Sequence, residues 1–102
     1  MTQEWTFDVP QETLKEFCHK WKIKELSIFG SALRASFTAD SDIDFLAKFA
    51  GDADWSVFDV SRMNDELSKL FGREVDIVEE SGLRNPFRRR EILANRNVIY
   101  VS

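Results

Sequence analysis

Residues 26–34 read LSIFGSALR, and residues 40–46 read DSDIDFL. The first stretch is largely apolar and is interrupted at Gly30, while the second begins with acidic and polar residues before it becomes apolar. An apolar run that ends in glycine predicts a strand followed by a sharp turn, and the second stretch predicts a further strand. The elements expected around these stretches are a strand at 23–29, a short helix at 31–37, a polar turn at 38–41 and a strand at 43–49.

Hydrophobic spacing extends this pattern toward both ends of the chain. A helix is predicted over residues 10–21, and a longer one over residues 55–71 ends before Gly72, a natural helix stop. The apolar faces of these two helices comprise Leu14, Phe17, Cys18 and Trp21 in the first, and Val60, Met63, Leu67, Leu70 and Phe71 in the second. Further elements are expected as a strand at 75–78, a helix at 85–94 with Asn85 as its N-cap and Pro86 in its first turn, and a strand at 98–101. The predicted fold class is therefore α/β (α+β), a small sheet flanked by helices.

Length and composition exclude several classes of protein. The 102 residues suffice for one compact domain, expected to span 1–102, and a net charge of −4 argues against bulk attraction to nucleic acid. The single cysteine cannot form an intrachain disulfide, which fits a reducing cytosol. The first ten residues lack the apolar core of a signal peptide, and no apolar run is long enough to span a bilayer. We expect a cytoplasmic protein.

Gly30 and Ser31 form a candidate phosphate site. Glycine permits a sharp turn and lets a ligand approach without a Cβ in the way. A helix that starts at Ser31 offers unpaired N–H groups and the positive end of its dipole, to which the serine hydroxyl adds another donor. Alone, however, the pair is also a common turn and N-cap signal.

Asp42 and Asp44 form a candidate metal site. Residues two apart on a strand point to the same face, so both carboxylates project together while Ile43 and Phe45 point into the core. Two adjacent anions repel each other unless a cation lies between them. Mg²⁺ prefers carboxylates, waters and substrate phosphates. Taken alone, an Asp-x-Asp pair is by default a solvated acidic start of a strand.

A third acid makes the combination more specific. Asp76 alternates with the apolar residues Val75 and Ile77 on a later predicted strand. If that strand pairs beside Asp42 and Asp44, three carboxylates converge. Such a group would suit two metal ions that promote in-line nucleotidyl transfer.

These residues resemble a known signature. Gly30-Ser31-x-x-Arg34, then Ser41-Asp42-x-Asp44 and a later Asp76, are similar to the motif of the DNA polymerase beta superfamily of nucleotidyltransferases. In size and local sequence the chain most resembles the minimal nucleotidyltransferases, including the MntA-like antitoxins. The resemblance spans Trp21 to Tyr100. Ala35 stands where the family usually has glycine, and Phe45 where it usually has leucine.

The resemblance implies a function and a role for each matching residue. Asp42, Asp44 and Asp76 would be catalytic and would bind two Mg²⁺ ions, whereas Gly30, Ser31 and Ser41 would bind the nucleotide. Arg34 would contact phosphate or pair with an acid to fix the loop. The enzyme would transfer AMP from ATP, or another NMP from its NTP, to a tyrosine hydroxyl of a HEPN-domain toxin, and so act as the antitoxin of a type VII toxin–antitoxin system. Nucleic acid is not expected as a direct substrate.

Two other functions remain open at this stage. One is a non-catalytic antitoxin that masks its partner. The other is a transferase acting on a small molecule, as in aminoglycoside-modifying relatives, slightly favoured by the acidic residues Asp52, Asp54 and Asp59. Exposed aromatic residues would allow homo-oligomers.

Other notable residues have simpler interpretations. His19 is expected on the surface, and Cys18 is expected in the core. The tryptophans Trp5, Trp21 and Trp55 are expected as core or interface anchors. The cluster Arg84, Arg88, Arg89 and Arg90 is by default a solvated helix face, and alternatively a patch that receives RNA, nucleotide phosphate or an acidic partner.

Overall fold

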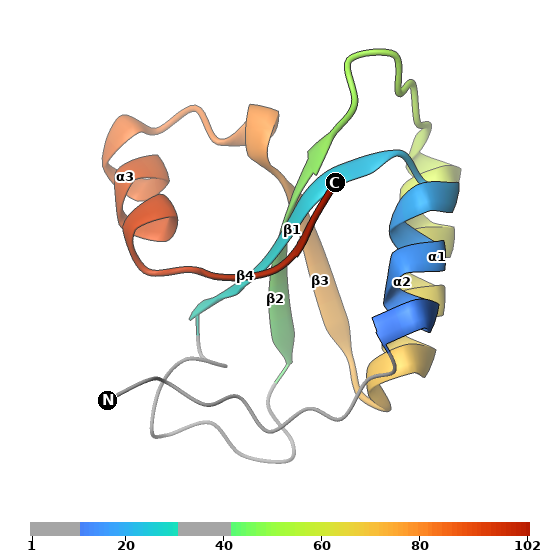
Figure 1. Cartoon of the computed structure of the whole chain (residues 1–102). Helices are drawn as coiled ribbons and strands as arrows, with labels where there is room; N and C mark the ends of the chain where they lie inside the picture. Colours follow the sequence, from blue (N-terminus) through green and yellow to red (C-terminus); the bar gives the residue numbers. More distant parts are fainter. Residues whose placement is uncertain (1–10, 31–41) are drawn as a thin grey trace.

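The order of helices and strands follows the sequence predictions closely. The computed structural model describes residues 11–30 and 42–102 (Figure 1). The elements are α1 (Gln11–Lys20), β1 (Ile23–Phe29), β2 (Ile43–Phe49), α2 (Val57–Phe71), β3 (Val75–Glu79), the 3-10 helix η2 (Glu80–Gly82), α3 (Pro86–Ala94) and β4 (Asn97–Val101). The predicted helix at 31–37 and turn at 38–41 lie outside the described residues, as does Trp5. The short helix η2 has no counterpart among the predictions.

The described strands form one mixed sheet in the order β3-β2-β1-β4. β1 pairs antiparallel with both β2 and β4, whereas β2 and β3 run parallel. A parallel pair needs a crossover connection, and α2 supplies it between β2 and β3. This pairing places the strand that carries Asp76 directly beside the strand that carries Asp44.

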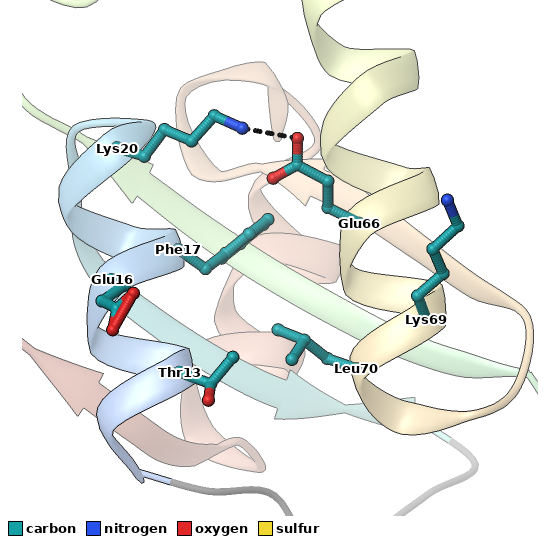
Figure 2. Close-up of a pocket in the computed structure, with 7 residues that line it drawn as sticks. All are labelled: Thr13, Glu16, Phe17, Lys20, Glu66, Lys69 and Leu70. Atoms are coloured by element: carbon teal, nitrogen blue, oxygen red, sulfur yellow. Dashed lines mark hydrogen bonds and ion pairs between the residues drawn. The ribbon is translucent and has the colours of Figure 1, made fainter.

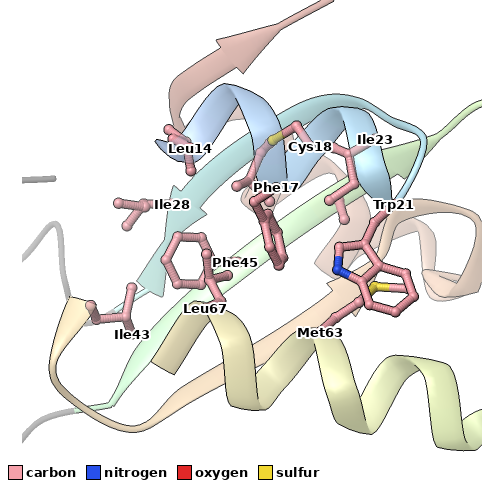
Figure 3. Packing of buried hydrophobic residues seen from close by; sticks show 12 residues of the cluster. Leu14, Phe17, Cys18, Trp21, Ile23, Ile28, Ile43, Phe45, Met63 and Leu67 are labelled. Atoms are coloured by element: carbon pink, nitrogen blue, oxygen red, sulfur yellow. The ribbon is translucent and has the colours of Figure 1, made fainter. Parts of the chain in front are cut away.

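The larger hydrophobic core lies between the sheet and the helices α1 and α2, which cover the same face (Figure 1). Leu14 and Cys18 of α1 and Met63 and Leu67 of α2 are almost fully buried against the strands (Figure 3). Phe45 of β2 is fully buried at the centre of this layer. The predicted apolar stripes of both helices are therefore the faces that pack on the sheet.

The opposite face of the sheet is covered by α3 and the segment that precedes it (Figure 1). A second, smaller core forms there from Phe29 of β1, Leu46 of β2, Leu83, and Ile92 of α3. Because alternate residues of a strand point to opposite faces, Leu46 belongs to this layer while its neighbour Phe45 belongs to the first. The sheet thus has helices on both faces.

Local capping signals set the ends of the helices. Ser56 accepts a hydrogen bond from the backbone N–H of Asp59, and the Asp59 side chain accepts one from the Ser56 N–H. This capping box starts α2 two residues later than predicted. Gly72 ends the helix in the left-handed conformation at φ 69°. Asn85 caps α3 by accepting from the N–H groups of Phe87 and Arg88.

In the part of the chain that the structure describes, no helix combines the length and the apolar character that a membrane crossing requires.

Candidate active site

A row of acidic residues crosses β2 and β3. Asp44 and Asp76 are register partners on these two parallel strands, so their side chains emerge side by side on one face. Asp42 precedes β2 by one residue and lies two residues before Asp44, so it is expected on the same face as Asp44. Leu46 and Val78, each two residues further along, pack into the core under α3, so the acidic row lies on the face that α3 covers. The predicted common face of Asp44 and Asp76 is confirmed.

Gly30 lies against the carboxylate of Asp44. On the other side of β2, Phe29 is the register partner of Asp44, and Gly30 follows it at the end of β1. Gly30 has φ +74°, and a Cβ built on it would lie 2.5 Å from Oδ2 of Asp44. Glycine is required here for two reasons: its backbone is in the left-handed region, and its missing side chain leaves space for the carboxylate.

Electrostatic coupling links the acids of the row. Burial raises the pKa of the Asp44 carboxyl above its ordinary value, and the negative charges of Asp76 and Asp42 raise it further. The positive charge of Arg88 lowers it, but less. Asp44 is half-buried, whereas Asp42 and Asp76 are exposed. Among the described residues, the net result of these effects is a raised pKa for Asp44.

The donor chemistry of this row fits a divalent cation. A cation would relieve the repulsion that raises the pKa of Asp44, and carboxylate oxygens are ligands that Mg²⁺ prefers. Within residues 11–30 and 42–102, no three His, Cys, Asp or Glu side chains lie close enough together to hold a metal ion. Binding would therefore require the carboxylates to draw together. The metal-binding role of Asp42, Asp44 and Asp76 stays a prediction.

The arginines of the C-terminal helix divide into two groups. Arg89 is half-buried and donates to the carbonyl oxygen of Glu80 at 3.1 Å and to its carboxylate at 3.2 Å. Arg84, Arg88 and Arg90 are exposed. The default prediction of a solvated helix face fits these three, whereas Arg89 anchors α3 to η2. The influence of Arg88 on Asp44 was not visible in the sequence, because it depends on which face of the sheet α3 covers.

Comparison with known proteins identifies the fold and its chemistry. The nucleotidyltransferase domain family matches residues 11–99, a range that includes Gly30 and all three acids. The chain belongs to this family. The nucleotidyltransferase domain thus accounts for most of the chain, and the enzyme class expected from the motif is confirmed.

Relatives of similar length carry related names. A predicted protein adenylyltransferase of Methanocaldococcus jannaschii is 35% identical over 94 residues, which is 92% of each chain. The protein adenylyltransferase MntA of Thermococcus cleftensis is 30% identical over 87 residues, covering 85% of this chain and 83% of the relative.

Solved structures share the fold of this nucleotidyltransferase. One, described as a predicted minimal nucleotidyltransferase, has a TM-score of 0.68 and 31% identity, and the match covers 89% of this chain and 88% of that one. Another is a tri-AMPylated HEPN toxin of Shewanella oneidensis in complex with an MNT antitoxin, with a TM-score of 0.60, 14% identity, and coverage of 90% and 70%. The fold is that of the minimal nucleotidyltransferases, as the resemblance implied.

The remaining predicted residues of the nucleotidyltransferase site are not all described. Ser31, Arg34 and Ser41, predicted to bind the nucleotide, lie outside the described residues, as does Ala35. Gly30 is described and lies beside Asp44.

Residues with simpler interpretations lie away from the acidic row. His19 is exposed and Cys18 is fully buried, as predicted, and burial raises the pKa of the Cys18 thiol to about 12. Trp21 and Trp55 pack edge to face at a centroid distance of 5.1 Å.

The acids that slightly favoured a small-molecule substrate have local partners. Asp52 pairs with Lys22 at 3.1 Å, and Asp59 belongs to the capping box of α2. Asp54 is exposed. Two of these three side chains therefore already have structural partners.

A groove of about 390 Å³ lies between α1 and α2 (Figure 2). These two helices cover the face of the sheet opposite to the acidic row. Phe17 and Leu70 line the groove, and Lys20 bridges its rim to Glu66 at 2.7 Å. Burial tends to raise the pKa of Glu66, but hydrogen bonds from Lys20 and Trp21, together with the positive charges of Lys20 and Arg62, lower it below its ordinary value. This ion pair ties α1 to α2 and takes no part in the acidic row.

Proposed function

We propose that this nucleotidyltransferase transfers AMP from ATP to a hydroxyl group of a partner protein, and that the partner is a HEPN-type toxin. The relatives of similar length are named as protein adenylyltransferases, and one protein of the same fold was solved with an AMPylated HEPN toxin. Modification of a tyrosine of such a toxin would make this chain an antitoxin. The observation that carries the proposal is the acidic row, with Gly30 packed against Asp44.

The proposed reaction is an in-line displacement at the α-phosphorus of ATP. A bond forms between the acceptor oxygen and the α-phosphorus, and the bond from the α-phosphorus to the bridging oxygen of the β-phosphate breaks. Pyrophosphate leaves with that electron pair. The proton of the acceptor hydroxyl passes to a carboxylate of the enzyme.

The residues of the row divide this work. Asp42, Asp44 and Asp76 would hold the Mg²⁺ ions, which supply Lewis acidity and charge neutralisation when bound. Asp76 lies on the edge strand β3 and its side chain is exposed, so a protein acceptor has direct access to it. We assign Asp76 as the group that receives the hydroxyl proton. Gly30 leaves the space that the carboxylate of Asp44 occupies beside the end of β1.

Label transfer from α-³²P-labelled ATP to a co-expressed HEPN toxin tests the proposal. Asp44→Asn and Asp76→Asn should each reduce the initial rate at least about 100-fold, because each removes a charge that positions the reacting groups. Asp65→Asn is the matched control, since it removes an exposed carboxylate from α2 on the other side of the sheet. The control should transfer label at the wild-type rate.

Two outcomes would contradict the proposal. Unchanged transfer by Asp44→Asn would show that the acidic row does not perform the reaction. Neutralisation of the toxin by the Asp44→Asn and Asp76→Asn double variant, with no nucleotide present, would instead show that the chain acts by binding alone. Mass spectrometry of the toxin identifies the product, since each transfer adds one AMP unit to a tyrosine.

A further inference from the structure

Arg88 lies on the side of α3 that faces the sheet. Ile92 of α3 is buried against Leu46 and Phe29. Arg88 precedes Ile92 by four residues, and residues four apart occupy the same side of a helix, one turn from each other. Leu46 follows Asp44 by two residues and so shares its face of the sheet. Arg88 and the acidic row therefore occupy the same layer of the molecule.

The backbone that carries Arg88 is held in place from two directions. Arg89 donates to both the carbonyl and the carboxylate of Glu80, the first residue after β3. Asn85 caps the N-terminus of α3, accepting at 3.0 Å and 3.2 Å from Phe87 and Arg88. The Arg88 side chain itself is exposed. A fixed backbone with a solvent-accessible guanidinium suits a residue that binds a ligand arriving from solution.

The charge of Arg88 acts on the centre of the row. Among the described residues that affect the pKa of Asp44, Arg88 supplies the positive charge that lowers it, opposed by Asp76 and Asp42. A guanidinium is permanently charged and binds phosphate oxygens through two parallel hydrogen bonds, which an ammonium group does not reproduce.

We propose that Arg88 is a further nucleotide-binding residue, whose guanidinium donates to the β- or γ-phosphate of ATP held at the row of Asp42, Asp44 and Asp76. The inference rests on the proposed function, because it takes ATP as the substrate. Gly30 then lies on the β1 side of Asp44 and Asp76 lies on its β3 side. Arg88 acts on Asp44 from α3 through its positive charge. In this position Arg88 also offsets the charge that develops on departing pyrophosphate.

Binding of two nucleotides that differ in their outer phosphates tests this role. Calorimetry with the full chain in Mg²⁺ would measure the Kd of AMP-PNP and of AMP. Arg88→Ala should weaken the binding of AMP-PNP about 10- to 100-fold, which is the loss expected for hydrogen bonds to a charged group. The Kd of AMP should stay within about twofold of the wild-type value, because AMP lacks the outer phosphates. The Kd of Arg88→Lys for AMP-PNP should lie between those of wild type and Arg88→Ala. Lysine keeps the positive charge but cannot form the two parallel hydrogen bonds of a guanidinium.

Arg90→Ala is the matched control. Arg90 is an exposed arginine of the same helix, but it lies two residues from Arg88 and so points to another side of α3. The Arg90→Ala variant should bind AMP-PNP with the wild-type Kd. Thermal unfolding of each variant checks the fold, and if Arg88→Ala does not fold, Arg88→Lys and Arg88→Gln provide the comparison.

The outcomes separate this inference from the proposed function. Equal AMP-PNP affinities for Arg88→Ala and Arg90→Ala would overturn the role of Arg88 while leaving the transferase proposal intact. Equal losses for AMP and AMP-PNP would also overturn it, because they would reflect a general change of charge or structure. Failure of the wild-type protein to bind AMP-PNP would overturn both.

Discussion

Replacing Gly30 by alanine should damage activity far more than stability. The new Cβ would lie 2.5 Å from Oδ2 of Asp44, about 0.9 Å inside the 3.4 Å at which ordinary van der Waals contact begins. The carboxylate must therefore shift by about 1 Å, and a misplacement of that size in a catalytic group costs about 100-fold in rate. The backbone at φ +74° adds strain of about 1–2 kcal/mol for a residue with a Cβ.

Gly72→Ala separates these two effects. Gly72 has nearly the same backbone conformation, φ +69°, but a Cβ there meets nothing within 4 Å. It should lose the same 1–2 kcal/mol, roughly, without any effect on the acidic row. A loss of 1 kcal/mol lowers the Tm of a domain of this size by about 4–8 °C.

The assay pairs thermal unfolding with the initial rate of AMP transfer from labelled ATP, measured well below both melting temperatures. We expect both variants to melt earlier and Gly30→Ala alone to lose about 100-fold in rate. The reasoning would be refuted by a Gly30→Ala variant that transfers AMP as fast as Gly72→Ala.

Three further predictions concern pH, a helix end and the core. The folded-state pKa of Asp44 is raised, so its ionised form opposes folding above that pKa and this penalty disappears as the pH falls through it. Asp44→Asn should therefore be more stable than wild type at pH 7, and urea titrations between pH 4 and pH 7 should show the difference shrinking toward acid; a difference that grows toward acid would contradict this. Ser56→Ala removes one half of the capping box on α2 and should cost about 1 kcal/mol in thermal unfolding while the transfer rate stays at the wild-type level. Met63→Ala, at a fully buried position, should cost about 2–5 kcal/mol in urea unfolding, and a loss below 1 kcal/mol, roughly, would mean that α2 does not pack as described.

Local physics explains why the helices and strands were predictable. The period of α2 placed Met63 and Leu67 on one side, and both are fully buried. Gly72 and Asn85 act as helix ends because their own backbone and side-chain chemistry requires no distant partner. The alternation of β2 likewise sends Ile43 and Phe45 inward, so the side of the strand on which Asp44 emerges followed from its neighbours.

The assembly of the site needed long-range contacts. The sequence named Asp76 as a candidate, but only the parallel pairing of β2 with β3 makes it the register partner of Asp44. That pairing depends on how α2 crosses over and packs, which no local pattern encodes. The same holds for Arg88. Its spacing of four residues from Ile92 can be read from the sequence, but the face of the sheet that Ile92 covers depends on its packing against Leu46 and Phe29. Periodicity determines which side of an element is apolar, and tertiary packing determines what that side meets.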